Sequence, residues 1–144
     1  ALHNVELPLI YSRMRKAEWG RIVNVSAHST KRQTPTLIGY TAAKAALTSM
    51  SKNLAKTLAR ENILVNTVSP GTFLSGGVKS WLEGMAKQRG IDAQAVYDEV
   101  AAQTALRHLP TSEEIADAVV FFASDLARVI TGQSLDVNGG HVFH

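Results

Sequence analysis

Tyr40 and Lys44 are the two side chains whose types and spacing point most directly to chemistry. They stand four residues apart in the segment YTAAK, and residues at this spacing lie on one face of a helix, one turn from each other. An ammonium group close to a phenol stabilises the charged phenolate, so the pair is suited to passing a proton to or from a carbonyl or alcohol oxygen. Because this spacing also arises by chance, the pair needs support from the surrounding sequence.

Three apolar segments supply the elements that must position this pair. Gly20 to Ser26 (GRIVNVS) ends in small polar residues, Ile63 to Gly71 (ILVNTVSPG) ends in a Pro-Gly turn, and Ile130 to Gly140 (ITGQSLDVNGG) ends in two glycines. We expect one short strand in each segment, and the near-continuous apolar character of the second indicates a parallel strand covered on both faces. The predicted strands cover residues 22–25, 63–68 and 135–137.

Helices are predicted between these strands from apolar residues at helical spacing. Asp92 is expected to cap one of them, and the segment TSEE at 111–114 has the pattern of a capping box. The alternation of strands and helices predicts an α/β architecture. The predicted helices cover residues 4–17, 38–60, 78–89, 92–104 and 115–124, and residues 26–37 are expected to form a loop.

Composition is that of one ordinary globular domain. The 144 residues are 45% hydrophobic with a net charge of +3 and contain no cysteine, so disulfides and thiolate chemistry are excluded and a reducing cytoplasm is our predicted location. The longest apolar stretch is far shorter than the roughly 18 residues of a membrane helix. Basic residues are scattered, so we expect neither a nucleic-acid nor a membrane partner. The five histidines lack metal-binding spacing, no metal is expected, and His141 and His144 are predicted to lie on a loose tail.

Taken in order, the three apolar segments and YTAAK resemble the short-chain dehydrogenase/reductase family, over about residues 10 to 140. The resemblance implies a Rossmann-like doubly wound parallel sheet. It also implies an oxidoreductase that transfers a hydride between NAD or NADP and a carbonyl or secondary alcohol substrate. Ketoacyl-carrier reductases and simple alcohol dehydrogenases are the most similar members, so a 3-ketoacyl substrate is possible. A homodimer or homotetramer is expected by the same resemblance.

No glycine-rich turn follows a predicted strand, as a dinucleotide site of this family requires. We therefore interpret residues 1–144 as the C-terminal part of a single Rossmann-like domain whose dinucleotide-binding part lies before residue 1. The strand at 22–25 would then present an unpaired apolar edge in the isolated part. We expect that this part alone neither binds cofactor nor stays monomeric.

The resemblance assigns roles to particular residues. Tyr40 is implied as the acid/base and Lys44 as the group that assists it and binds the cofactor ribose. The Pro-Gly turn is implied to line the nicotinamide, with backbone contacts from Phe73 and a hydroxyl contact from Ser75. The implied cofactor-binding residues are Val25, Tyr40, Lys44, Pro70, Gly71, Phe73 and Ser75.

The substrate-binding serine of the family is the point at which this sequence departs from the pattern. Its usual position, thirteen residues before Tyr40, holds Ala27. A one-residue adjustment of the loop would let Ser26 serve, Ser29 is a second candidate, and the third possibility is that no hydroxyl is present. We predict Ser26 as the catalytic serine. Losing such a donor costs about 100-fold or more in rate, so the alternative function is a non-catalytic or impaired relative that acts as a scaffold or interaction module.

Overall fold

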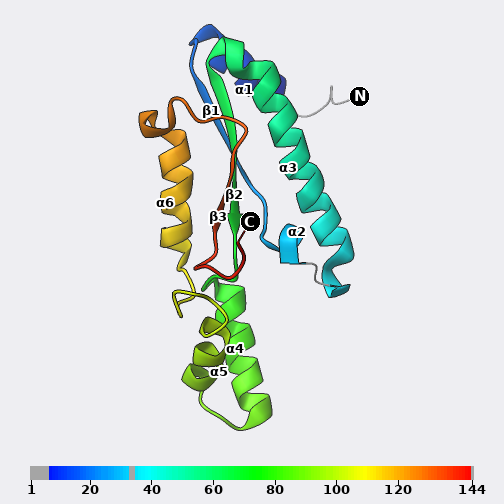
Figure 1. Cartoon of the computed structure of the whole chain (residues 1–144), viewed down its shortest axis with the longest axis vertical. Coiled ribbons are helices and arrows are strands. Elements are labelled where there is room, and N and C mark those ends of the chain that lie inside the picture. Colours follow the sequence, from blue (N-terminus) through cyan, green and yellow to red (C-terminus); the bar gives the residue numbers. More distant parts are fainter. Residues whose placement is uncertain (1–6, 33–34, 144) are drawn as a thin grey trace.

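The computed structural model describes residues 7–32 and 35–143. Its three strands form one parallel sheet in the order β1-β2-β3, with Val25 of β1 beside Val68 of β2 and Pro70 of β2 beside Val137 of β3. Helices α1 and α3 lie on one side of this sheet and α6 lies on the other (Figure 1). The predicted α/β class is therefore confirmed. The strands are β1 (Gly20–Val25), β2 (Ile63–Pro70) and β3 (Ser134–Val137).

Within the described residues, six helices and three short 3-10 segments connect and flank the strands. They are α1 (Leu7–Lys16), α2 (Ser29–Arg32), η1 (Pro35–Leu37), α3 (Ile38–Leu58), η2 (Ala59–Glu61), α4 (Gly76–Arg89), α5 (Ala93–Ala101), α6 (Ser112–Ala123) and η3 (Asp125–Ala127). The five predicted helices are present. Residues 4–6 of the predicted 4–17 helix lie outside the described residues. The loop prediction for 26–37 was wrong in part, because α2 and η1 form there.

Strand β2 is the centre of the core because both of its faces are covered. All eight of its residues are buried, as the continuous apolar run predicts. Ile63 and Val65 pack with Ala55 and Leu58 of α3 on one face, and Val68 belongs to the cluster on the other face, built with α6 and η3. Each fully buried aliphatic side chain contributes about 1.5–3 kcal/mol to folding, so the strand that leads to the Pro-Gly turn is held firmly.

The turn between η3 and β3 is fixed to β2 by hydrogen bonds. The side chain of Asn66, only 1% exposed, donates from Nδ2 to the Ile130 carbonyl at 2.8 Å and accepts from the Gln133 N–H at 3.0 Å. The Val65 N–H donates to Thr131 Oγ1 at 3.1 Å, and the Gly132 N–H donates to the Val65 carbonyl at 2.7 Å. These bonds set the register in which β3 joins the sheet.

Helices α4 and α5 form a separate unit beyond the carboxyl ends of the strands (Figure 1). Leu82, Ala86 and Val96 are its buried centre. The predicted N-cap is confirmed, since the Asp92 side chain accepts from the Gln94 N–H at 3.0 Å. The predicted capping box also forms, with Thr111 and Glu114 each accepting from the backbone N–H of the other.

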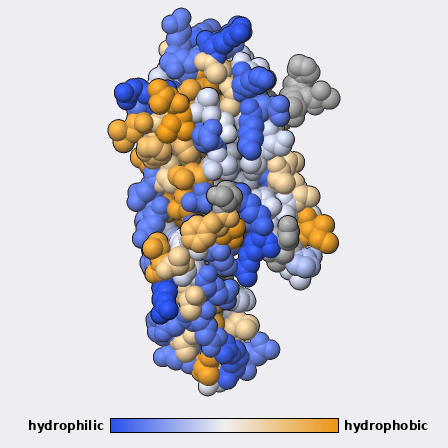
Figure 2. All heavy atoms as spheres, in the orientation of Figure 1, coloured by the Kyte–Doolittle hydropathy of each residue, from blue (hydrophilic) through white to orange (hydrophobic). Residues whose placement is uncertain are grey.

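The surface carries exposed hydrophobic side chains over α6 and η3. Val120, Leu126 and Val129 are 64%, 75% and 88% exposed, and Figure 2 shows hydrophobic atoms gathered over this part of the molecule. Across residues 7–32 and 35–143, none of the helices combines the length and apolar character that crossing a bilayer requires.

Candidate active site

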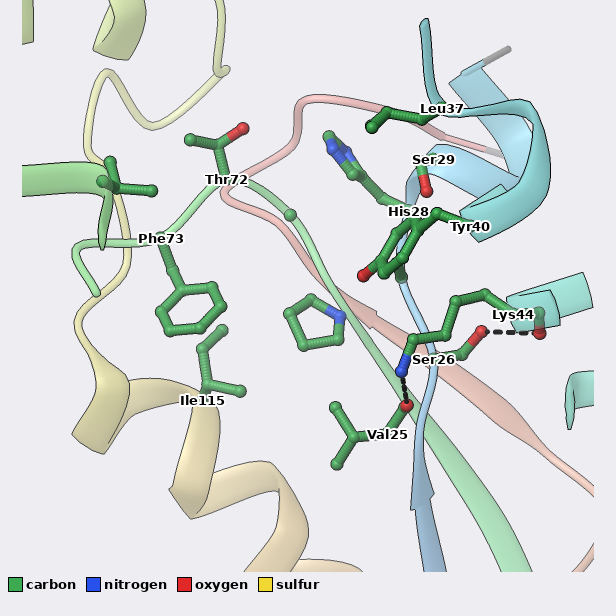
Figure 3. Close-up of a pocket in the computed structure, with 14 residues that line it drawn as sticks. Val25, Ser26, His28, Ser29, Leu37, Tyr40, Lys44, Thr72, Phe73 and Ile115 are labelled. Carbon is green, nitrogen blue, oxygen red and sulfur yellow. Dashed lines mark hydrogen bonds between the residues drawn. The ribbon is translucent and has the colours of Figure 1, made fainter. Parts of the chain in front are cut away.

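A cavity of about 500 Å³ lies where β1 and β2 end (Figure 3). Because parallel strands end at the same edge of a sheet, the residues that follow β1 and β2 meet there. The first turn of α3 and the start of α4 and α6 close the other sides. The lining residues are Val25, Ser26, Ala27, His28, Ser29, Leu37, Tyr40, Lys44, Pro70, Gly71, Thr72, Phe73, Val78 and Ile115.

Tyr40 and Lys44 both line this cavity from the first two turns of α3. Lys44 Nζ lies 5.7 Å from the centre of the Tyr40 ring and donates a hydrogen bond to the Val25 carbonyl at 2.8 Å. The Tyr40 hydroxyl points toward the interior of the cavity (Figure 3), and the Tyr40 side chain is 48% exposed. The structure thus brings together the phenol, the ammonium group and the end of β1.

The hydroxyl of Ser26 faces α3. It donates to the Lys44 carbonyl at 3.1 Å and shares a 2.9 Å hydrogen bond with Thr48 Oγ1, and the residue is only 3% exposed. Ala27 is buried beside it. Ser29 Oγ is buried in the cavity wall with no hydrogen-bond partner within the part of the chain that the structure describes. Ser26 therefore has a hydroxyl that is already hydrogen-bonded, Ala27 has no hydroxyl, and Ser29 has a hydroxyl without a partner among the described residues.

The Pro-Gly turn forms the wall opposite Tyr40. Gly71 approaches the tail after β3 so closely that a Cβ added to it would lie 2.6 Å from Asn138 Cβ, a separation that only glycine tolerates without a shift of the backbone. Pro70, Gly71 and Phe73 line the cavity as the sequence suggests. Ser75 does not. Its Oγ caps α4 by accepting from the Val78 N–H at 3.3 Å, and Thr72 is the hydroxyl-bearing residue after the Pro-Gly turn that lines the cavity.

His28 is the most polar lining residue that sequence reasoning missed. Its backbone N–H donates to the Pro70 carbonyl at 2.9 Å, which fixes it beside the Pro-Gly turn. Its ring meets the His141 ring edge to face, with centroids 5.2 Å apart. His28 lies only three residues after the end of β1, and this position at the carboxyl end of a parallel strand could have indicated from the sequence that it belongs to the site. Leu37, Val78 and Ile115 come from three separate elements and carry no sequence signal for a shared site.

The pKa values of both histidines lie below the ordinary value for histidine. Burial is the first cause for His28, followed by repulsion from His141 and Arg32, whereas Asp136 acts in the opposite direction. Burial is also the first cause for His141, followed by repulsion from Arg32. The prediction of a loose tail at His141 was wrong, because its N–H donates to Asn138 Oδ1 at 3.1 Å. His144 lies outside the described residues.

Comparison with known proteins gives consistent matches over most of the chain. Residues 9–142 match the family model described as Enoyl-(Acyl carrier protein) reductase. The chain is 38% identical to 3-oxoacyl-(acyl-carrier-protein) reductase FabG of Aquifex aeolicus over 89% of its length, and 34% identical to acetoacetyl-CoA reductase of Rhizobium meliloti over 97%. It is also similar to the crystal structure of YwfH, an NADPH-dependent reductase involved in bacilysin biosynthesis, with a TM-score of 0.83 and 29% identity over 94% of the chain.

The chain spans about half the length of these relatives. It covers 47% of the Aquifex aeolicus reductase, 54% of the Rhizobium meliloti reductase and 52% of YwfH.

Proposed function

Since this chain belongs to the short-chain dehydrogenase/reductase family, we propose that the natural protein interconverts a carbonyl compound and a secondary alcohol with NAD or NADP. The reductase names of its relatives support a 3-ketoacyl compound as the first substrate class to test. The single observation that carries the proposal is the convergence of Tyr40, Lys44 and the Pro70–Gly71 turn on one cavity.

Tyr40 is the proposed acid/base. In the direction of reduction, its hydroxyl gives a proton to the carbonyl oxygen as the carbonyl carbon accepts a hydride, so that a ketone becomes a secondary alcohol. Lys44 stabilises the phenolate left on Tyr40, because its ammonium group lies close to the ring. Held by the Val25 carbonyl, Lys44 still has two N–H groups for the hydroxyls of a cofactor ribose.

The residues present fit a nicotinamide. Pro70, Gly71 and Phe73 line the cavity together with Tyr40, and the backbone N–H groups of Thr72 and Phe73 lack hydrogen-bond partners among residues 7–32 and 35–143. These N–H groups are suited to a carboxamide oxygen. A bound reduced nicotinamide would supply the hydride. Val25, Pro70, Gly71 and Phe73 are the residues proposed to hold it, and Ser75 contributes only if the cap of α4 opens.

A hydrogen-bond donor to the substrate oxygen is still required beside Tyr40. Ser26 meets that need only if its hydroxyl turns from α3 into the cavity, which breaks its bond to the Lys44 carbonyl. A hydroxyl has a single proton to donate, so Ser26 cannot donate to the Lys44 carbonyl and to the substrate at once. Ser26 remains our proposed donor, and this rotation is the condition for its role.

The test is the substitution of Tyr40 by phenylalanine in the natural full-length protein. Removal of a general acid lowers turnover about 100- to 10,000-fold, whereas binding of NADH or NADPH, measured by calorimetry, should stay within a few-fold. Substitution of Tyr97, which does not line this cavity and whose hydroxyl accepts from the Leu109 N–H at 3.3 Å, by phenylalanine is the matched control. Turnover that survives in the Tyr40 variant would reject the assignment, and a protein that binds neither cofactor would favour the non-catalytic alternative.

The domain organisation and assembly also remain proposals. We propose that residues 1–144 are the C-terminal part of a single Rossmann-like domain and that the natural protein is a cytoplasmic homodimer or homotetramer. The exposed hydrophobic side chains over α6 and η3 support a contact between subunits.

A further inference from the structure

Thr48 lies one turn beyond Lys44 on α3, next to the serine that is proposed to assist Tyr40. Its Oγ1 donates to the Lys44 carbonyl at 3.0 Å, and the same carbonyl accepts from the Ser26 hydroxyl at 3.1 Å (Figure 3). The two hydroxyl oxygens are themselves 2.9 Å apart. The Lys44 carbonyl and the two hydroxyls therefore form a triangle of three oxygen atoms, each within hydrogen-bond distance of the other two.

Only two protons serve the three contacts of this triangle. Each hydroxyl has one proton to donate and the carbonyl has none, so one contact is without a proton in every arrangement. The Lys44 carbonyl also lies inside α3, where one of its two lone pairs accepts a backbone N–H of the helix. The hydroxyls of Ser26 and Thr48 thus compete for the other lone pair.

The groups around this triangle are fixed, so the serine side chain is the part that can turn. Lys44 is tied to the end of β1 by the bond from its Nζ to the Val25 carbonyl, at 2.8 Å. One turn further along α3, Ser51 Oγ accepts from Asn24 Nδ2 at 2.8 Å. Ser26 lines the cavity, and a rotation about its Cα–Cβ bond changes the direction of its hydroxyl without moving either backbone.

From this competition we infer that Thr48 is a positioning residue for Ser26, because it keeps the Lys44 carbonyl occupied when the serine hydroxyl turns toward the substrate. This inference rests on the proposed function, in which Ser26 donates to the substrate oxygen. The bond from Thr48 Oγ1 to the carbonyl is already in place before the turn. The turn therefore exchanges one hydrogen bond of Ser26 for another and leaves the carbonyl served.

The first test is a double-mutant cycle in kcat/KM on the natural full-length protein, with methyl 3-oxobutanoate and NADH or NADPH. Thr48→Val keeps the shape of the side chain and removes its hydroxyl, so Ser26 becomes the one hydroxyl at the carbonyl and turns less readily. A hydrogen bond between uncharged groups corresponds to about 2- to 10-fold in an equilibrium constant, so Thr48→Val should lower kcat/KM by this factor. In the Ser26→Ala background it should have no further effect, and Thr48→Ser should restore the rate.

Thr57 supplies the matched control, because its Oγ1 donates to the Asn53 carbonyl at 2.9 Å, the same bond across four residues on the exposed side of α3. Thr57→Val should leave kcat/KM unchanged. An equal loss from Thr48→Val with and without the serine hydroxyl would indicate a purely structural effect and overturn the inference. No loss from Thr48→Val in the presence of Ser26 would also overturn it.

The second test does not depend on turnover. If each hydroxyl serves the carbonyl when the other is absent, Ser26→Ala should destabilise the Thr48→Val protein more than it destabilises the natural protein. Urea denaturation gives the unfolding equilibrium constants, and the two effects of Ser26→Ala should differ about 2- to 10-fold. Equal effects would overturn the inference whether or not the protein is active. Unequal effects in a protein that transfers no hydride would reject the proposed function and retain the exchange at the Lys44 carbonyl.

Discussion

Asn66 is a buried side chain whose removal should weaken the sheet next to the site. Asn66→Ala removes the bond from Nδ2 to the Ile130 carbonyl and the bond from the Gln133 N–H to Oδ1. Ile130 is partly buried, so its carbonyl left without a partner costs about 1–2 kcal/mol, whereas Gln133 is exposed and water can replace its bond, so this loss costs about 0.5–1.5 kcal/mol. The expected loss in the free energy of unfolding is about 1.5–3.5 kcal/mol. That is a large fraction of the roughly 5–15 kcal/mol by which domains are stable.

Urea denaturation of the natural full-length protein measures this loss as a shift of the midpoint at constant slope. Asn53→Ala is the matched control, because Asn53 is exposed and its Nδ2 donates only to the Ser49 carbonyl of its own helix, at 3.0 Å. Alanine is the better helix former at that position, so the control should change stability by less than about 0.5 kcal/mol. Faster hydrogen exchange of the Gln133 N–H in Asn66→Ala would locate the effect. If the Asn66 variant lost no more stability than the Asn53 variant, the role given to this side chain would be refuted.

Two further predictions concern charged groups. Lys44→Met should lower kcat/KM about 3- to 100-fold. Coulomb's law gives this range for a separation of 5.7 Å when the dielectric constant varies from that of water to that of a protein surface. Lys52→Met, on the exposed side of α3, is the control and should have no effect in the same steady-state assay. Glu114 accepts from His108 Nε2 and from the Thr111 N–H, both at 2.8 Å, and these bonds, His108 first, hold its pKa below the ordinary value for glutamate. The stability that they contribute is therefore present above that value and is lost as the pH falls and the carboxylate is protonated. Glu114→Gln should remove this acid-dependent loss from melting curves recorded between about pH 3 and 7, and an unchanged pH profile would count against it.

The sequence predicted those features that depend on local pattern. The continuous apolar run of β2 indicated a strand buried on both faces, and its eight residues are buried. Capping at Asp92 and Thr111 followed from side chains that accept from nearby backbone N–H groups. The placement of Tyr40 and Lys44 on one side of α3 followed from helical periodicity.

The remaining features depend on contacts between segments that are distant in the chain. The direction of the Ser26 hydroxyl is set by Thr48, which lies in the middle of α3, and periodicity does not determine that contact. The pairing of His28 with His141 requires that the segments after β1 and β3 meet at one edge of the sheet. Thr72 is a cavity residue where Ser75 was expected, because the helix α4 begins early enough to use Ser75 as its cap.

The close approach of Gly71 to Asn138 has a consequence for the evolution and engineering of this cavity. A side chain at position 71 would meet not only Asn138 Cβ but also its Cα, at 2.8 Å, and Asn138 in turn accepts the N–H groups of Gly140 and His141. Positions 71 and 138 should therefore change together. A larger residue at position 71 would be tolerated only if the segment that contains Asn138 had already shifted away. A mutant library that randomises the cavity should keep both positions fixed or vary them together, because a substitution at position 71 alone would displace the segment after β3.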